Sequence, residues 1–430
     1  MTILISHPQR AALHDEVHQR PGMPVLTPAR VSSLTLYGAA MTQYRDFFNA
    51  LLQSIGQPPV ALAISHWQHS FADFELRWSL HNEFARLTVV QNVVASDFAG
   101  TALQSLPAAI WAKLPGHVIS AVHALVLHPK HAPEQLTTVA QRWFSGNTLV
   151  GAKVAHGKLI VLSDLKRHHD EQIENGATRL IVINFGAGKH LTGRVLHDFF
   201  EMESYRLMGL LSFPLAKQLL PIVTAMETQL QAITKAIADG EEPELTQTQL
   251  NQVAEQLEDA IASSHFRFSA TRAYAAMMER RLKNLHEDSF EGFASFSEFM
   301  ERRISPAFAT VESVRTRLQE LSGHLQRTSE LLRTRIEMKL LKQNQALLTA
   351  LNQRAAVQLR LQQTVEGLSV AVIGYYAVSL LHYVLDGVAH SGIAIDPTVA
   401  TAVAVPFILA GLMWRLHTLR KHFVDDVSTT

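Results

Sequence analysis

The chain has 430 residues, no cysteine, and 38 basic side chains against 38 acidic ones. This length allows two or three domains. The lack of cysteine excludes disulfides and thiolate metal sites, and it is typical of a reducing compartment. A formal charge of zero gives no general attraction to nucleic acid, so we do not predict nucleic acid as a partner.

The first two hundred residues carry the patterns of a mixed α/β domain. Residues 31–55 suggest one helical stretch. Aromatic and β-branched residues then predict two strands, at 71–80 and 84–92, joined as a hairpin around Asn82. The remaining apolar runs predict a short helix at 106–114, strands at 118–127 and 179–185, and two short strands within 151–162. We therefore predict an α+β fold whose N-terminal α/β domain covers residues 1–193 and is cytoplasmic.

Helices dominate after residue 193. A helix over 194–238, bent near Pro214 and Pro221, is followed by an exposed turn at 239–243 and a second helix over 246–287. A third helix is predicted to begin near Ser295, with Pro306 in its early turns. Along it, seven apolar residues recur at spacings of three, four and seven: Val311, Val314, Leu318, Leu321, Leu325, Leu332 and Ile336. This coiled-coil seam predicts a helical bundle with a long coiled-coil-like helix over 194–365, and a homo-oligomer.

Two apolar runs near the C-terminus, 368–385 and 398–414, contain no Lys, Arg, Asp or Glu. About 17 to 25 apolar residues cross a bilayer as a helix, so we predict a two-helix transmembrane hairpin within 366–430, with the lipid bilayer as a partner. The linker between the runs has two acids and no Lys or Arg, whereas three basic residues follow the second run. By the positive-inside rule, both termini are expected in the cytoplasm. The N-terminus has no basic region followed by an apolar core, so no secretory signal is expected.

Four polar residues of the first apolar run share one helical face. At 100° per residue, Tyr375, Ser379, His382 and Asp386 lie within about 60° of one another. Polar groups inside a bilayer need partners. One interpretation is a pore lining with Asp386 as an outer acidic ring. The alternative is a packing interface between helices.

Two histidines near the N-terminus have the spacing of metal ligands. His14 and His18 would share a helical face, and such a pair can hold a divalent cation. The alternative is that this arm simply docks onto the domain. We predict no other cofactor. His168, His169 and Asp170 are expected to lie solvated in a polar loop.

Residues 186–193 (GAGKHLTG) separate a predicted strand from a helix. The start of that helix and Lys189 could hold an anion, although the spacing is not that of a Walker loop. The alternative is a glycine turn between domains. Residues 263–274 alternate aromatic and basic side chains, which we interpret as bundle packing, with Arg267 and Arg272 paired to acids. No Ser–His–Asp arrangement or catalytic carboxylate pair is visible, so we predict that the chain is not an enzyme.

Several segments resemble a bacterial domain-of-unknown-function family described as predicted membrane-anchored proteins. This resemblance covers almost the whole chain and implies the bacterial inner membrane as the location, without implying a reaction. The segments are LHDEVHQRP (13–21), RWSLHNEF (77–84), ESYRLMGLLSFPLAK (203–217), SSHFRFSATRAY (263–274), FSEFMERR (296–303) and QLRLQQTVEGLSVAVIGYYAVSLL (358–381).

The order of the parts resembles that of CorA-type magnesium channels. The resemblance implies a pentamer whose first membrane helix lines a pore. However, the Gly-Met-Asn signature of those channels is absent, and Leu385, Asp386 and Gly387 stand at about that place. Two functions are therefore expected as alternatives. One is an inner-membrane-anchored, oligomeric scaffold or interaction protein, and the other is a CorA-like oligomeric cation channel.

Overall fold

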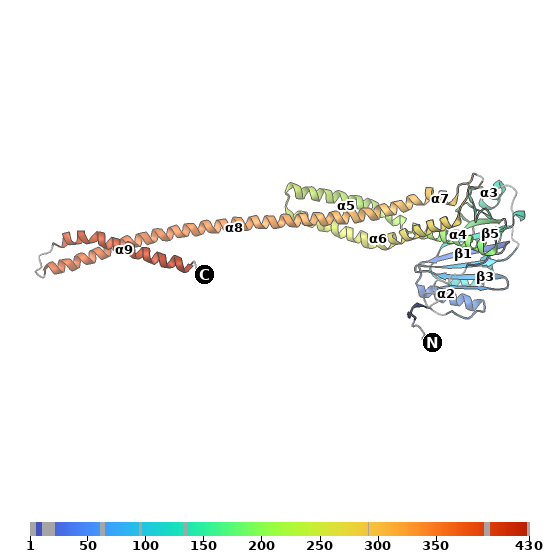
Figure 1. Ribbon diagram of the computed structural model, residues 1–430, viewed down its shortest axis with the longest axis horizontal. Coiled ribbons are helices and arrows are strands. Elements are labelled where there is room, and N and C mark those ends of the chain that lie inside the picture. Colours follow the sequence, from blue (N-terminus) through green and yellow to red (C-terminus); the bar gives the residue numbers. More distant parts are fainter. Residues whose placement is uncertain are drawn as a thin grey trace. The chain divides into compact units, whose positions relative to one another are not determined.

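The computed structural model describes residues 6–10, 22–60, 65–93, 97–131, 136–290, 292–390 and 396–427. The chain forms two compact units, Met1–Ser329 and Glu330–Thr430. The first unit holds a sheet followed by long helices, and the second holds apolar helices (Figure 1). This confirms the mixed α+β class. The predicted domain limits at residues 193 and 365 stay a prediction.

In the described part of the chain, the sheet has nine strands in the order β2-β3-β4-β1-β5-β9-β7-β6, with β8 paired to β9. β5 and β9 are parallel, and the other paired neighbours are antiparallel. The strands are β1 (Ala29–Tyr37), β2 (His66–Ser70), β3 (Phe74–Leu80), β4 (Phe84–Gln91), β5 (His117–Leu127), β6 (Val150–Val154), β7 (Leu159–Ser163), β8 (Arg167–His168) and β9 (Ala177–Asn184).

Most of the predicted strands are confirmed, including the β3–β4 hairpin, β5, the β6–β7 pair and β9. The short helix predicted at 106–114 is present as 3₁₀ turns at Ala102–Ser105 and Ala108–Lys113. The helix predicted over 31–55 is wrong in its first part, because β1 occupies it and only α2 (Met41–Ser54) is helical. In β1, Leu34 and Leu36 alternate with Ser33 and Thr35, which is the period of a strand with two different faces. The prediction also missed β2, β8, α3 (Leu136–Phe144) and the 3₁₀ turn Pro129–His131.

Helices cover both faces of the sheet (Figure 1). On one face, α2 packs an apolar core in which the rings of Phe48 and Trp78 stack with centroids 4.8 Å apart. On the other face lies α4 (Lys189–Leu210), whose Val195, Leu196 and Phe199 join a second core with strand residues. The sheet is therefore the middle layer of the first unit.

The bundle consists of α4, α5 (Phe213–Asp239), α6 (Pro243–Leu285) and the start of α8 (Ser305–His390), with the short α7 (Phe296–Arg303) before it. The bend predicted near Pro214 is a break between α4 and α5, and Pro214 stands in the first turn of α5, where its missing N–H is tolerated. The predicted turn at 239–243 is confirmed, and Gly240 adopts a φ of 86° there. Pro306 is the second residue of α8, which begins at Ser305, rather than lying inside a helix that starts near Ser295.

Over its first part, the predicted coiled-coil seam is buried against other parts of the same chain. Val311, Val314, Leu318 and Leu321 are buried within the first unit. Arg317, on the same stretch of α8, pairs with Glu227 of α5 at 2.6 Å. In this stretch the spacing therefore reports packing within one chain and gives no evidence for a second copy.

Among the residues that the structure describes, three helical stretches are long and apolar enough to cross a membrane: Lys189–Asp239, Ser305–Ala389 and Pro397–Arg415. They differ in burial. A third of the apolar window in Lys189–Asp239 is buried, which fits its place in the bundle, against 6% and 0% in the other two. The last stretch belongs to α9 (Pro397–Val427), and together with the end of α8 it forms the second unit.

Gly193 allows a test of the close packing between α4 and the backbone at Met23. A Cβ at this position would lie 1.7 Å from the carbonyl oxygen of Met23, so only glycine allows this approach. We expect Gly193→Ala to destabilise the first unit by about 2 kcal/mol or more, since overpacking of a tight contact typically costs 1–3 kcal/mol. Gly188→Ala is the control, because a Cβ there meets nothing within 4 Å and its φ is −70°. Gly188 is the N-cap of α4, where alanine is less favourable than glycine, so we expect the control to cost about 1 kcal/mol or less.

Urea unfolding of the full chain in detergent, followed by tryptophan fluorescence, measures both variants. Four of the five tryptophans lie in the first unit, so this signal reports mainly on it: Trp67, Trp78, Trp111 and Trp143. Equal unfolding midpoints for the two variants would contradict the proposed role of Gly193.

Candidate functional site

The face of the sheet beneath α4 is polar although it is buried. The registers Arg77↔Thr88 and Ser79↔Arg86 place side chains of β3 and β4 next to each other, and β1 continues the row. The opposite face is apolar, with Leu76 and Trp78 in the core under α2. Buried polar groups cost free energy unless they find partners, so this face departs from simple packing. Its buried polar members are Ser33, Thr35, Arg77, Ser79, Arg86, Thr88 and Ser120.

Glu201 of α4 is the centre of an ion network on this face. Its Oε1 lies 3.3 Å from the Arg86 guanidinium of β4 and 3.2 Å from Nε2 of His197. Its Oε2 lies 2.5 Å from the guanidinium of Arg281 on α6. Arg281 also donates to Asp198 at 3.0 Å. One buried carboxylate thus joins the sheet, α4 and α6.

The environment sets the protonation of these groups. Burial alone would raise the pKa of Glu201, but the hydrogen bond from His197 and the two guanidinium charges hold its pKa far below its ordinary value. Burial lowers the pKa of His197 despite its carboxylate partner, so the imidazole is neutral near pH 7 and donates from Nε2. Burial raises the pKa of Asp198. Because the pKa of Glu201 is depressed, its stabilising effect is present above pH 4.5 and is lost as the pH falls below it.

A cavity of about 980 Å³ opens beside this network. One face of α4 lines it, with residues spaced four, three, four and four apart, and the last turns of α6 face it with Tyr274, Met277, Arg280 and Arg281. The α4 residues are His190, Arg194, His197, Glu201 and Tyr205. Four arginines and four histidines, but a single carboxylate, occur among the described lining residues. The volume is at the upper end of the usual range for small-molecule sites.

The predicted anion site lies elsewhere, at the start of α4. Lys189 lines a separate cavity of about 510 Å³ together with Asn184 and Gly186. The N–H groups of Gly186 and Ala187 both donate to Oδ1 of Asn184, at 2.9 and 2.6 Å, and so close the loop on itself. The anion-binding role of Lys189 stays a prediction.

The predicted metal pair, His14 and His18, lies outside the described residues. Within the described part of the chain, no three His, Asp or Glu side chains are grouped as a metal site would require. The possible divalent cation stays a prediction.

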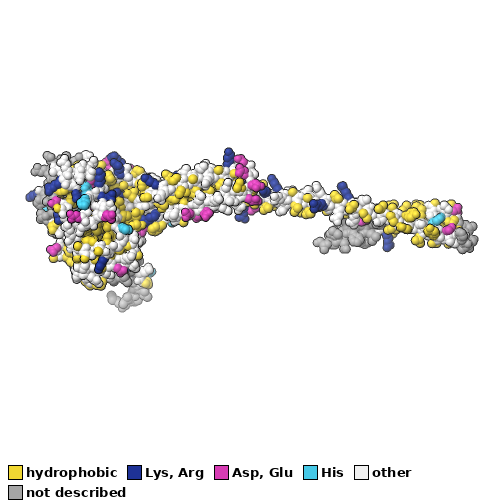
Figure 2. Space-filling model, turned by 180° about the vertical axis from the view of Figure 1, so that it is seen from behind, with side chains coloured by type: hydrophobic (Ala, Val, Ile, Leu, Met, Phe, Trp, Pro, Cys, Tyr) yellow, Lys and Arg dark blue, Asp and Glu magenta, His cyan; other side chains and the backbone are white. Residues whose placement is uncertain are grey.

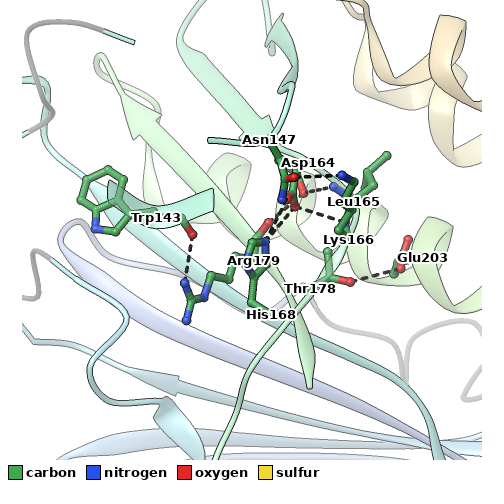
Figure 3. Close-up of polar contacts among 10 residues, drawn as sticks. Trp143, Asn147, Asp164, Leu165, Lys166, His168, Thr178, Arg179 and Glu203 are labelled. Atoms are coloured by element: carbon green, nitrogen blue, oxygen red, sulfur yellow. Dashed lines mark hydrogen bonds and ion pairs between the residues drawn. The ribbon is translucent and has the colours of Figure 1, made fainter. Parts of the chain in front are cut away.

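The solvated loop predicted around His168 is wrong for two of its three residues. The His168 ring is buried, and its Nε2 lies 2.9 Å from Oδ2 of Asp164, which also accepts from Asn147 (Figure 3). Asp170 is 9% exposed at its side chain, and its carboxylate lies 3.1 Å from Nε2 of His123. Only His169 is exposed as expected. Glu203 and Arg206 line a neighbouring cavity of about 710 Å³, where the Arg206 guanidinium donates a hydrogen bond to the Glu203 carboxylate.

The structure also contains a Ser–His–Asp chain of contacts that was not predicted from the sequence. Nδ1 of His123 is 2.8 Å from the hydroxyl of Ser32, and its Nε2 faces Asp170. Ser32 is completely buried and its hydroxyl also accepts from the N–H of Ala102. A nucleophile must be reachable by its substrate, so we interpret this chain as a structural connection between strands and loops.

The packing predicted for residues 263–274 holds in part. Phe268 and Tyr274 are buried, whereas Phe266 is exposed. Arg267 forms an ion pair with Glu83 of the β3–β4 turn. This pairing fits the interpretation of the segment as bundle packing.

The predicted pore residues lie in the second unit. Nδ1 of His382 is 3.1 Å from the hydroxyl of Thr401 on α9, and Tyr375 is 72% exposed. Gly374 packs against α9, since a Cβ there would be 3.1 Å from Leu409. Whether Tyr375, Ser379, His382 and Asp386 line a pore stays a prediction.

Comparison with known proteins identifies the family. A family model described as "Protein of unknown function (DUF3422)" matches residues 5–423. The chain belongs to this family. The match confirms the predicted resemblance to a family of unknown function. No curated protein and no solved structure matches the chain, and the likeness to CorA-type channels stays a prediction.

Glu201→Gln tests the ion network. The substitution keeps the side-chain size but leaves the buried Arg86 without its counter-ion, and the half-buried Arg281 keeps only Asp198. Removing one partner of a buried ion pair costs about 3–5 kcal/mol, so we expect a large fall in the unfolding midpoint. The control is Glu312→Gln, which breaks an exposed pair with Arg315 on α8 and should cost less than about 1 kcal/mol. Urea unfolding monitored by tryptophan fluorescence gives both values, and similar losses would show that Glu201 does not hold the unit together.

Proposed function

We propose that this chain is an inner-membrane-anchored protein that self-associates and holds its large N-terminal part in the cytoplasm as a scaffold or interaction domain. The observation that carries the proposal is the lack of burial of the two C-terminal apolar stretches, 6% and 0%. Figure 2 shows many hydrophobic side chains on the surface of the described part of the second unit. Apolar surface of this extent is stable in lipid and unfavourable in water.

A hairpin of two membrane helices accounts for the charge distribution. The segment between the two runs contains Asp386 and Asp396 and no Lys or Arg, while Arg415 follows the second run. Since basic residues stay on the cytoplasmic side, the first unit and the C-terminus are placed in the cytoplasm and the turn outside. The contacts of Gly374 and His382 with α9 support an antiparallel pair.

Self-association is supported by the part of α8 that follows the buried part of the seam. Leu340, Leu347 and Leu361 are each more than half exposed and lie seven or fourteen residues apart. Leu351 and Val365 form a second row, each four residues after a member of the first. A seven-residue repeat on an exposed helix is the pattern by which identical helices pair.

Because the natural sequence contains no cysteine, each single-cysteine variant has one reactive thiol, and its labelling reports on that position alone. Gly387→Cys lies near the proposed outer turn, and a Cβ there meets nothing within 4 Å. Ser263→Cys lies on the exposed side of α6 in the first unit. We expect a membrane-impermeant maleimide to label Gly387→Cys in intact spheroplasts, and Ser263→Cys only after permeabilisation. Labelling of Ser263→Cys in intact spheroplasts, or release of the chain by carbonate, would refute the proposed topology.

Oxidative cross-linking tests self-association. Leu347→Cys places a thiol in the exposed seven-residue row, and Thr349→Cys places one about 200° around the same helix. With copper phenanthroline in membranes, we expect disulfide-linked dimers of Leu347→Cys at least tenfold more abundant than those of Thr349→Cys. Equal yields, or no dimer from either variant, would count against pairing through this row.

A CorA-like cation channel is the second candidate, and one observation favours it. Although α9 packs against Gly374, the adjacent Tyr375 is 72% exposed, so its side chain stays available to other copies. In a ring of copies, for example a pentamer, Tyr375, Ser379, His382 and Asp386 would then line a central path. Cation flux into liposomes that contain the purified chain, reduced by His382→Ala, is required by this alternative and by no other interpretation of these residues.

A further inference from the structure

The 980 Å³ cavity of the first unit carries more positive charge than its own carboxylate neutralises. Glu201 is already engaged by Arg86, His197 and Arg281. Arg194 of α4 and Arg280 of α6 are exposed at the cavity and form no ion pair within the described part of the chain. The positive charges of Arg194 and Arg280 are therefore available to bind an anionic ligand.

A buried arginine of the sheet forms part of the floor of the cavity. Arg77 of β3 lines it and is only 7% exposed, and an arginine buried to this extent is uncommon in proteins. It belongs to the buried polar row of the sheet, next to Thr88 in the register. Arginines thus line the cavity from three separate elements, β3, α4 and α6.

One wall is aromatic. The ring of Phe84 lies 6.4 Å from that of Tyr205, which in turn lies 5.9 Å from that of Tyr274. Met277 adds exposed apolar surface at the same wall. A site that pairs several guanidinium groups with an apolar wall suits a ligand with an anionic end and a less polar body.

We propose that this cavity binds a phosphorylated small molecule, with the phosphate oxygens held by Arg77, Arg194 and Arg280. Guanidinium groups bind phosphate oxygens through paired N–H donors and keep their charge at all physiological pH values. Positive charge spread over three walls fits a polyanion better than a single carboxylate. The proposal concerns the first unit alone and does not depend on the membrane topology or on self-association.

Calorimetric titration of the full chain with inorganic tripolyphosphate tests the proposal. The chain is held in nanodiscs of phosphatidylcholine, whose headgroup has no net charge, and adenosine is titrated separately as an uncharged control. We expect saturable binding of tripolyphosphate and none of adenosine. Absence of tripolyphosphate binding, or equal binding of adenosine, would overturn the proposal.

Matched variants locate the binding. Arg280→Gln should raise the dissociation constant at least tenfold, and Arg194→Gln combined with it should raise it further. Both positions are exposed, so their removal should not prevent folding. Arg272→Gln is the control, since this arginine is also exposed on α6 but does not line the cavity. The control should change the constant by less than twofold, and equal effects of Arg272→Gln and Arg280→Gln would refute the site.

A lipid headgroup could supply the same phosphate chemistry as a soluble molecule. Nanodiscs in which phosphatidylglycerol replaces a fifth of the phosphatidylcholine separate the two sources. If phosphatidylglycerol weakens tripolyphosphate binding to the natural chain but has no such effect on Arg280→Gln, a lipid headgroup occupies the site. This outcome would overturn the proposal of a soluble ligand. If binding is unchanged, the ligand is soluble, as we propose.

Discussion

A buried carboxylate with three cationic or hydrogen-bonding partners holds the first unit at the point where its layers meet. Glu201 contacts Arg86 from the sheet and Arg281 from α6, while its own helix supplies His197. Each charge is tolerated inside the protein only because the others are present, since an isolated buried ion costs several kcal/mol. The sheet, α4 and α6 are therefore coupled electrostatically as well as by apolar packing.

This coupling explains why the two faces of one sheet differ so much. The face under α2 needs no polar partners, because its side chains fill a core around Trp78. The face under α4 carries arginines, serines and threonines whose partners lie partly on α4, as in the 2.7 Å contact between Thr35 and Ser204. The cavity begins at the edge where β3 passes α4 and α6, and Arg77 and Ser79 of this polar face line it. The cavity is thus the continuation of the polar face, which is why its floor is an arginine and not an apolar residue.

The sequence predicted the parts of this fold that depend on local patterns. The β3–β4 hairpin and β9 follow from β-branched and aromatic runs, and the turn at Gly240 follows from a short polar segment. β1 was missed because its buried serines and threonines look like the exposed face of an amphipathic helix. Their burial is decided by α4, which comes more than a hundred residues later in the chain. The same holds for the candidate site, whose residues come from β3, α4 and α6. A usable signal was present in Arg86, an arginine inside the apolar strand sequence FARLTVV, because such a residue must meet a buried anion.

Helix α8 shows where a seven-residue pattern stops being informative by itself. The pattern runs from Val311 onward, and spacing alone does not separate pairing within a chain from pairing between chains. Burial separates the two, because Val311 and Leu318 are covered in the first unit, whereas Leu347 and Leu361 are exposed in the second. A long row of exposed leucines on a helix in water is unfavourable unless another surface covers it. The row precedes the apolar run that begins at residue 368, and Arg354 and Arg360 interrupt this stretch with charge, so lipid is a poor cover for it. A second copy of the same helix, which presents the same repeat, is the cover that this stretch of sequence favours.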